Sequence, residues 1–166
     1  MIGVFSALLL ALSVHPWPVG PGPRYQPPAA AKPAPGLACG PRAPSFRVHL
    51  ELFAGRKVII VPAGIGAVAH SGCVYPLSTA GPDGVVSVAR GRALTLGDLF
   101  RVWGQPLGAH SLAGFTSRTP LRAYVGGRLV KGPVGAIRLT PHAQIVLELG
   151  GYVPPHPHFL FAGGDS

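Results

Sequence analysis

Histidine is the residue type in this chain with the clearest capacity for site chemistry. His156 and His158 flank Pro157 in a His-x-His pattern close to the end of the sequence. Alternate residues of an extended segment point the same way, so these two imidazoles could share one metal ion with a third ligand. His49 and His142 are the candidates for that third ligand. Surface histidines give the same pattern, so the main expectation is a protein without a cofactor. A copper or zinc site is the alternative.

The two cysteines of the chain, Cys39 and Cys73, are the next candidates. They lie 34 positions apart, and an even count in an exported chain argues for pairing. We expect a Cys39–Cys73 disulfide, which would stabilise the fold by roughly 3–4 kcal/mol through the chain entropy of the unfolded state. A catalytic cysteine is the competing interpretation. It needs a positioned histidine, and His70 is too close in sequence to receive that role from spacing.

Motifs for other chemistries are weak. The stretch 64–69 (GIGAVA) matches the dinucleotide-binding pattern, but Gly72 and Pro76 leave no room for the helix that must receive a pyrophosphate. We therefore expect only a tight turn at Gly64 and Gly66. Nucleophile-elbow, P-loop and zinc-protease motifs do not occur. Four acidic residues fall between Phe46 and Phe161, which leaves little carboxylate chemistry, so we expect no catalytic residue and no enzyme.

The elements that must hold these residues begin with a change of composition along the chain. Residues 1–14 contain an uncharged apolar run that predicts a signal peptide or an N-terminal anchor. Residues 15–45 are rich in Pro, Ala and Gly and predict a disordered tether. Residues 46–161 predict a single globular domain, and residues 162–166 a disordered tail. The expected location is therefore secreted or membrane-tethered, outside the cytoplasm.

Within the domain the pattern favours short strands. Apolar and polar residues alternate over 47–53, which predicts a half-buried strand with Arg47, His49 and Glu51 on its solvent face. A Gly55 turn leads to an apolar strand at 58–61, and a similar strand, glycine turn and strand follow at 121–130. Two β-hairpins in one domain could reflect a duplication or coincidence. Further strands are expected at 85–88 and 144–149.

One helix is well specified, at residues 96–103. Leu96, Leu99 and Trp103 fall on one stripe together with Phe100. Thr95 is the expected N-cap, with Asp98 completing a capping box, and Gly104 and Pro106 end the helix. The predicted fold class is α+β: a strand-rich small domain with two β-hairpins packed on one short amphipathic helix, in a grasp-like arrangement.

The charge balance indicates an anionic partner. The chain has 14 Lys and Arg against 5 Asp and Glu, a net charge of +9. Such a surface can hold phosphates, anionic lipid or acidic glycan. The basic residues are scattered singly and no nucleic-acid module is visible, so no specific nucleic-acid binding is expected. The partners that remain are an anionic envelope polymer or another envelope protein.

Three stretches carry a resemblance to a known group of proteins. Residues 61–66 (VPAGIG), 95–107 (TLGDLFRVWGQPL) and 142–149 (HAQIVLEL) resemble an uncharacterised family of small exported envelope proteins of GC-rich bacteria. The likeness spans about 48–161 and implies a fold and an exported setting. Members of that family carry an H-T-H-D stretch where this chain has residues 76–81 (PLSTAG). The absence of histidine there weakens the resemblance as support for a metal site.

These observations lead to one functional expectation with an alternative. The chain is expected to be an exported or surface-tethered, non-catalytic binding or structural module of the cell envelope. The alternative is an exported metal-binding protein that uses His156, His158 and one further histidine. An envelope hydrolase would need a nucleophile and a base at interpretable spacing, which the sequence does not offer.

Overall fold

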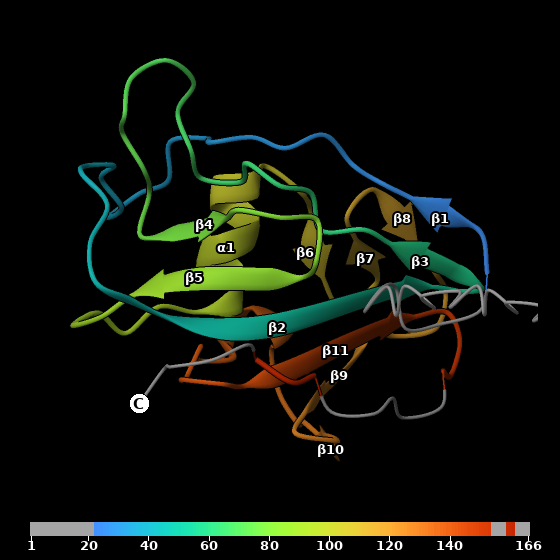
Figure 1. Cartoon of the computed structure of the whole chain (residues 1–166). Coiled ribbons are helices and arrows are strands. Elements are labelled where there is room, and N and C mark those ends of the chain that lie inside the picture. The colour runs from blue at the N-terminus through green and yellow to red at the C-terminus, as the bar shows by residue number, and fades with distance from the viewer. Residues whose placement is uncertain (1–21, 154–158, 162–166) are drawn as a thin grey trace, which may run out of the picture.

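Two β-sheets and one α-helix organise the described part of the chain (Figure 1). The computed structural model describes residues 22–153 and 159–161. The larger sheet has the strand order β1-β3-β2-β11-β9-β10, with β5 also paired to β2 and β4 paired to β5; the smaller sheet is β6-β7-β8. The elements are β1 (Arg24–Tyr25), β2 (Ser45–Ala54), β3 (Lys57–Ile59), β4 (Leu77–Thr79), β5 (Val85–Ala89), α1 (Leu96–Trp103), β6 (Leu107–Gly108), β7 (Ser111–Leu112), β8 (Phe115–Thr116), β9 (Arg122–Val125), β10 (Arg128–Leu129), the 3-10 turn Val134–Ala136 and β11 (Gln144–Leu149).

Both predicted hairpins are present. β2 and β3 pair antiparallel with Leu52 opposite Ile59, and Gly55 at φ 58° makes the turn between them. β9 and β10 pair antiparallel around Gly126 and Gly127, which also have positive φ. Only glycine adopts such angles without cost, which explains why the turn positions were readable in the sequence. The strand-rich α+β class is thereby confirmed.

The centre of the sheet joins the two hairpins. β11 lies between β2 and β9, parallel to β2 and antiparallel to β9, with Leu147 opposite Leu52 on one side and Ala123 on the other. A parallel pair needs a long crossover connection, and here that connection includes α1. Along its first half β2 also pairs with β5, with Phe46 opposite Val88. β2 therefore pairs with three strands, β3, β5 and β11, and joins them into one sheet.

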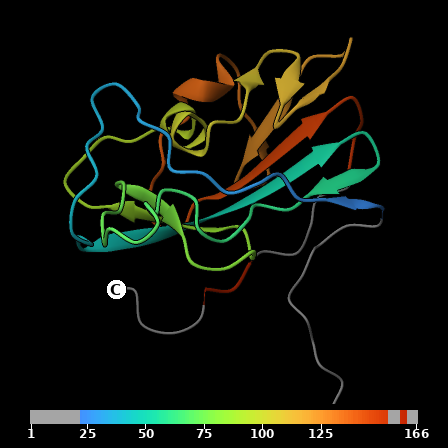
Figure 2. The ribbon, with the colours of Figure 1, turned by 90° about the horizontal axis from the view of Figure 1, so that it is seen from above.

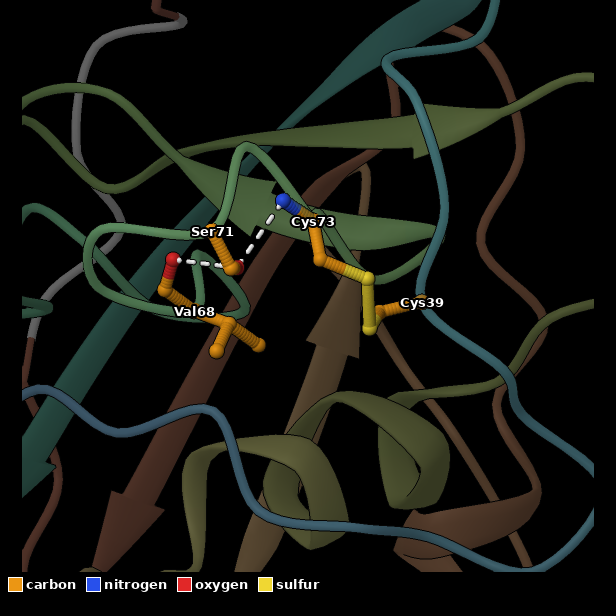
Figure 3. The surroundings of a disulfide bond; sticks show 4 residues. All are labelled: Cys39, Val68, Ser71 and Cys73. Atoms are coloured by element: carbon orange, nitrogen blue, oxygen red, sulfur yellow. Dashed lines mark hydrogen bonds between the residues drawn. A yellow bond between two sulfur atoms is a disulfide. The ribbon is translucent and has the colours of Figure 1, made fainter.

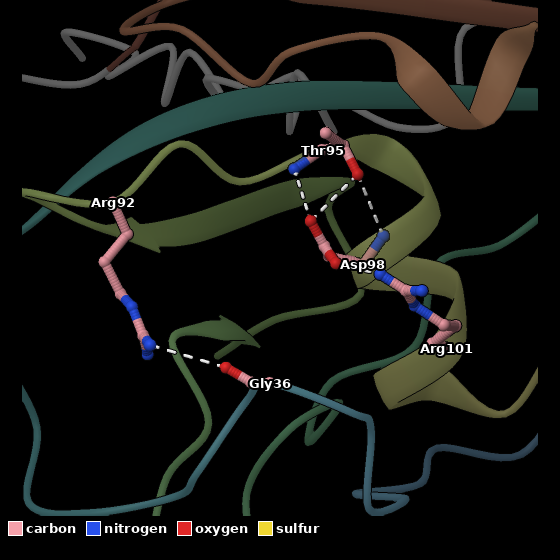
Figure 4. A network of polar contacts seen from close by, with 5 residues as sticks. All are labelled: Gly36, Arg92, Thr95, Asp98 and Arg101. Carbon is pink, nitrogen blue, oxygen red and sulfur yellow. Dashed lines mark hydrogen bonds and ion pairs between the residues drawn. The ribbon is translucent and has the colours of Figure 1, made fainter.

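Helix α1 has the predicted bounds and the predicted caps. The Thr95 hydroxyl accepts from the Asp98 amide, and the Asp98 carboxylate accepts from the Thr95 amide at 2.8 Å (Figure 4). The helix ends at Gly104, which has a left-handed backbone (φ 71°). Leu96, Leu99 and Trp103 are fully buried with their neighbours against one face of the sheet. Figure 2 shows the helix end-on above that face.

Residues 22–45 correct the expectation of a disordered tether. β1 pairs parallel with β3, and Ala34 is buried. The Trp103 indole N–H donates to the carbonyl of Pro28 at 3.0 Å, and the Lys32 amide donates to that of Val102 at 2.8 Å. We call residues 22–45 the strap. Contacts with the rest of the domain hold it in place, and its proline-rich composition does not predict them. Residues 15–21 of the expected tether lie outside the described residues, as do the predicted signal or anchor segment (1–14) and the predicted tail (162–166).

The far face of β2 corrects a second expectation. The alternation predicted that His49 and Glu51 face solvent, yet they are only 2% and 9% exposed. The Phe159 ring stacks on the His49 ring with centroids 4.0 Å apart, and Gln144 binds both the amide and the carbonyl of Phe159. Residues 159–161 thus cover a face of β2 that the alternation of the sequence predicted to be exposed to solvent.

In the described part of the chain, no helix has the length and apolar character that crossing a bilayer requires.

Candidate functional site

The predicted disulfide is present and fixes one wall of a pocket. Cys39, in the second half of the strap, is bonded to Cys73 with Cα atoms 5.4 Å apart (Figure 3). The turn that carries Cys73 is held by Ser71, whose hydroxyl donates to the Val68 carbonyl and accepts from the Cys73 amide at 3.1 Å. Beside the disulfide, Gly40 exchanges two backbone hydrogen bonds with Val74. The strap is therefore fastened to residues 68–74 by covalent and hydrogen bonds together.

Three serines of neighbouring strands line the pocket. Ser45 of β2 lies opposite Ala89 of β5, and Ser87 of β5 lies opposite Ser78 of β4. Each alternates with core residues such as Val88, so the serines share the sheet face that points away from α1. Hydroxyl groups both donate and accept hydrogen bonds. This side of the pocket is thus polar but uncharged.

The rim of the pocket is cationic. Arg42 comes from the strap, and Arg90 and Arg92 come from the turn after β5; all three are exposed. The Arg92 guanidinium donates to the Gly36 carbonyl at 3.4 Å, which steadies it against the strap (Figure 4). No acidic side chain of the described residues forms an ion pair with these arginines. The three guanidinium groups thus keep their charge available for a ligand.

The composition of the pocket decides what it can do chemically. Its volume is about 230 Å³, and the lining residues include arginine, serine and tyrosine but no carboxylate or histidine. Arginine recognises carboxylate and phosphate oxygens with paired hydrogen bonds. A general base and a free thiol are both missing from the lining, because Cys39 is in the disulfide. The arrangement is suited to binding an anionic group.

The predicted metal ligands do not form a site within the described residues. His49 is buried beneath Phe159, whereas His142 is exposed and lies against Phe161 with ring centroids 5.0 Å apart. Among the residues that the structure describes, no three His, Cys, Asp or Glu side chains gather in a way that could hold a metal ion. His156 and His158 lie outside the described residues, so a site built on them stays a prediction.

Three other titratable groups, His49, Glu51 and Glu148, lie on the sheet face that points away from α1. Desolvation lowers the pKa of His49 to about 4, against a smaller upward effect of Asp83. Desolvation also raises the pKa of Glu51 to about 7. The pKa of Glu148 is likewise raised by desolvation, partly offset by the Val153 amide and by Arg122. The His49 Nδ1 and Glu51 Oε1 atoms are 3.6 Å apart, and near pH 5–6 both groups are neutral, so this contact is not an ion pair there.

The remaining candidates from the sequence have structural roles. Gly64 and Gly66 adopt φ 86° and 73° in a tight turn, as expected, and the Gly66 amide donates to the Ala30 carbonyl of the strap. Asp98 caps α1 and pairs with Arg101 (Figure 4). Desolvation raises the pKa of Asp98, but the bonds from Thr95 and Arg101 outweigh it and hold that pKa below its usual value.

Sequence reasoning did not find the arginine pocket. Arg42 is about 50 positions from Arg90 and Arg92, and single arginines in turns are ordinary surface residues. The disulfide expectation carried the only available signal, because it placed the second half of the strap beside residues near Cys73.

Comparisons with known proteins add no functional assignment. The chain matches no protein-family model, and no solved structure matches it. Its resemblance to exported envelope proteins accordingly stays a prediction from its motifs.

Proposed function

We propose that this protein is an exported, non-catalytic binding module that holds an anionic group of an envelope polymer in the pocket rimmed by Arg42, Arg90 and Arg92. The observation that carries the proposal is that three exposed arginines, with no acidic partner among the described residues, line one pocket together with three serines. Phosphate and carboxylate are the anions that such a set of donors binds best.

The size of the pocket favours a repeating unit over a complete small ligand. About 230 Å³ is below the 300–1,000 Å³ typical of pockets that enclose drug-sized molecules. A single phosphate or uronate unit fits such a volume, and the rest of a polymer would continue outside it. Repetition of weakly bound units along a chain then raises the overall affinity.

The disulfide supports an extracytoplasmic setting. Disulfides persist in oxidising compartments and are rare in the cytoplasm. Cys39 of this bond also lines the proposed site, so an oxidising compartment and a formed pocket belong together. The apolar run at residues 2–14 supports export independently of the fold.

Calorimetric titration of the full chain with sodium polyphosphate and polygalacturonate, with neutral dextran as reference, tests the proposal. We expect binding to at least one anionic polymer and none to dextran. The triple variant Arg42→Gln/Arg90→Gln/Arg92→Gln should weaken the binding by tenfold or more, since each exposed charged contact contributes roughly 0.5–1 kcal/mol.

A matched variant separates the pocket from the net charge. Arg128→Gln/Lys131→Gln/Arg138→Gln removes the same three charges from exposed positions that do not line the pocket. We expect this control to change the affinity less than threefold. Equal losses of polymer affinity in the two triple variants would show that the interaction is nonspecific attraction to the net charge. The absence of any polymer binding would refute the proposed function.

We also propose that the fold is grasp-like. The proposal is supported by the order β3-β2-β11-β9-β10, in which the hairpin β2–β3 contributes β2 to the central parallel pair β2–β11 and the hairpin β9–β10 lies beside β11. Helix α1 follows the first hairpin and lies against the sheet, as expected from the sequence. An experimental structure in which a solved grasp-like domain superposes on these five strands and α1 would test it.

A further inference from the structure

A second basic surface lies where the described chain enters the domain. It is made of cationic and aromatic side chains from β1, β3 and β8 and from the loops beside them, and we call it the entry patch: Arg24, Tyr25, Arg56, Lys57, Phe115 and Tyr152. β1 lies next to β3 because the Val58 amide donates to the Pro23 carbonyl at 3.0 Å. Figure 1 shows β1, β3 and β8 at the same end of the molecule.

Three members of the entry patch, Tyr25, Lys57 and Phe115, contact one another. The Tyr25 ring meets the Phe115 ring edge-on with centroids 5.1 Å apart, and the Lys57 Nζ lies 5.6 Å from the centre of the Phe115 ring. The backbone of Gly151 lies against that of Gly55, which brings Tyr152 beside the β2–β3 turn. The Lys57 ammonium and the Tyr25 and Phe115 rings are therefore gathered on one face, whereas Arg24 precedes Tyr25 on β1 and points to the other side of this edge strand.

Exposure marks this surface as available to a partner. Tyr25 and Tyr152 are 43% and 61% exposed, which makes them two of the four exposed large hydrophobic residues of the described chain. Arg24, Arg56 and Lys57 are exposed as well. Acidic residues of the described part are all buried or half-buried, so no carboxylate there neutralises the patch at the surface.

The length of chain before the patch points to a membrane. The apolar run ends at Val14, and residues 15–21 are the only connection between it and Gly22. Seven residues span at most about 25 Å even when fully extended. If the run stays in a bilayer as an anchor, as the sequence allows, the entry patch must lie within that distance of the lipid headgroups.

We propose that the entry patch docks on anionic phospholipid headgroups of the membrane that holds the N-terminal run. Basic residues next to a membrane segment are attracted to anionic headgroups, and tyrosine rings favour the boundary between headgroups and water. The patch and the arginine pocket lie at opposite ends of β2, whose ten residues cover about 30 Å. Docking at one end therefore leaves the pocket facing away from the lipid.

Vesicle flotation of the full chain tests this docking. The vesicles are pure phosphatidylcholine, or phosphatidylcholine with one third phosphatidylglycerol. The apolar run should support binding to both, so the measured quantity is the increase in partition that phosphatidylglycerol causes. For the wild-type chain we expect this increase to be about 100-fold or more, since each of three basic residues near the anionic surface contributes about 1 kcal/mol. The patch variant Arg24→Gln/Arg56→Gln/Lys57→Gln should lower partition onto the anionic vesicles by about 100-fold and leave binding to phosphatidylcholine unchanged.

Two control variants make the result specific. Arg128→Gln/Lys131→Gln/Arg138→Gln has the same net charge as the patch variant, and Arg42→Gln/Arg90→Gln/Arg92→Gln removes the pocket arginines. Both should keep the anionic-lipid increase within threefold of wild type. Equal losses in all three variants, or no increase with phosphatidylglycerol for wild type, would overturn the proposal. If the patch variant loses polyphosphate binding but keeps vesicle binding, the entry patch is a polymer site and the docking proposal is wrong. If only the pocket proposal is wrong, vesicle binding stays as described here.

Discussion

At the scale of single residues, burial has changed the chemistry of two groups that the sequence placed in water. His49 and Glu51 alternate with core residues along β2, so local periodicity puts them on a solvent face. Phe159 and Phe161 instead dock on this face, through the His49 ring and through a cation–π contact of Arg47 with Phe161 at 6.0 Å. The pKa values of His49 and Glu51 move in the directions that favour their neutral forms.

The raised pKa of Glu51 predicts a loss of stability on the alkaline side. In the folded state this pKa is about 7 against an ordinary value of 4.5, so between these values the folded state binds more protons than the unfolded state. The favourable contribution is complete below about pH 4.5 and is lost as the pH rises through about 7. Glu51→Gln removes this titration. Urea unfolding at pH 5.5 and pH 8 should show that wild type loses about 1–3 kcal/mol more stability across this interval than the variant.

His49 supplies the control for the direction of that effect. Its pKa is lowered, so its contribution is lost as the pH falls from 6.5 toward 4. Wild type and Glu51→Gln share this acid-side loss, which therefore cancels in their comparison. An identical pH dependence of the two proteins between pH 5.5 and 8 would show that Glu51 is ionised in the folded state and would contradict the prediction.

At the scale of elements, short-range patterns predicted the structure well wherever neighbouring residues carry the determinants. The α1 bounds, its Thr95–Asp98 capping box and its Gly104 stop follow from spacings of at most four residues. The hairpin turns follow from glycines at positive φ. Short-range patterns did not predict that the strap is ordered, because its order depends on distant partners. Trp103, for example, lies 75 positions from Pro28.

The disulfide is the main covalent element that keeps the strap in place. In Cys39→Ser/Cys73→Ser we expect a loss of roughly 3–4 kcal/mol in unfolding free energy, since the unfolded chain regains the entropy of a 34-residue loop. Hydrogen exchange should also show faster exchange at the amides of Lys32 and Gly40, which bond to carbonyls elsewhere in the domain.

Ser71→Ala is the matched control for that experiment. It removes the hydroxyl that braces the Cys73 turn but keeps the disulfide, so the expected cost is only about 1 kcal/mol with little change at Lys32. If the double cysteine variant kept both its stability and the protection of Lys32, the backbone contacts alone would hold the strap and the predicted role of the disulfide would be wrong.

At the scale of the whole molecule, the distribution of charge matters more than its sum. All 14 lysines and arginines lie in the described part of the chain, and all but Arg47 are exposed, whereas the acidic residues there are buried or half-buried. The surface therefore presents cations with little compensation. β2 separates the pocket from the entry patch by about 30 Å, well beyond the screening length of about 8–10 Å at physiological ionic strength.

This separation predicts that the two surfaces act independently. Under both proposals, wild-type protein should carry sodium polyphosphate onto vesicles containing phosphatidylglycerol, which would otherwise repel it. Sedimentation of vesicles with labelled polyphosphate measures this directly. The pocket variant and the patch variant should each lower the amount of polyphosphate that sediments with the vesicles at least tenfold. The control variant Arg128→Gln/Lys131→Gln/Arg138→Gln should leave this amount unchanged. Displacement of the protein from vesicles by polyphosphate would show instead that one surface serves both anions.

What the sequence determined by itself is what adjacent residues encode. The capped helix, the glycine-turned hairpins, the strong positive charge and the pairing of the only two cysteines required no knowledge of distant contacts. The tertiary structure alone decided that Arg42 meets Arg90 and Arg92, that the proline-rich strap is ordered, and that His49 is buried. These outcomes depend on strand pairing and side-chain contacts between residues far apart in the chain. Such contacts leave no periodic pattern in either segment, because each segment alone is compatible with solvent exposure.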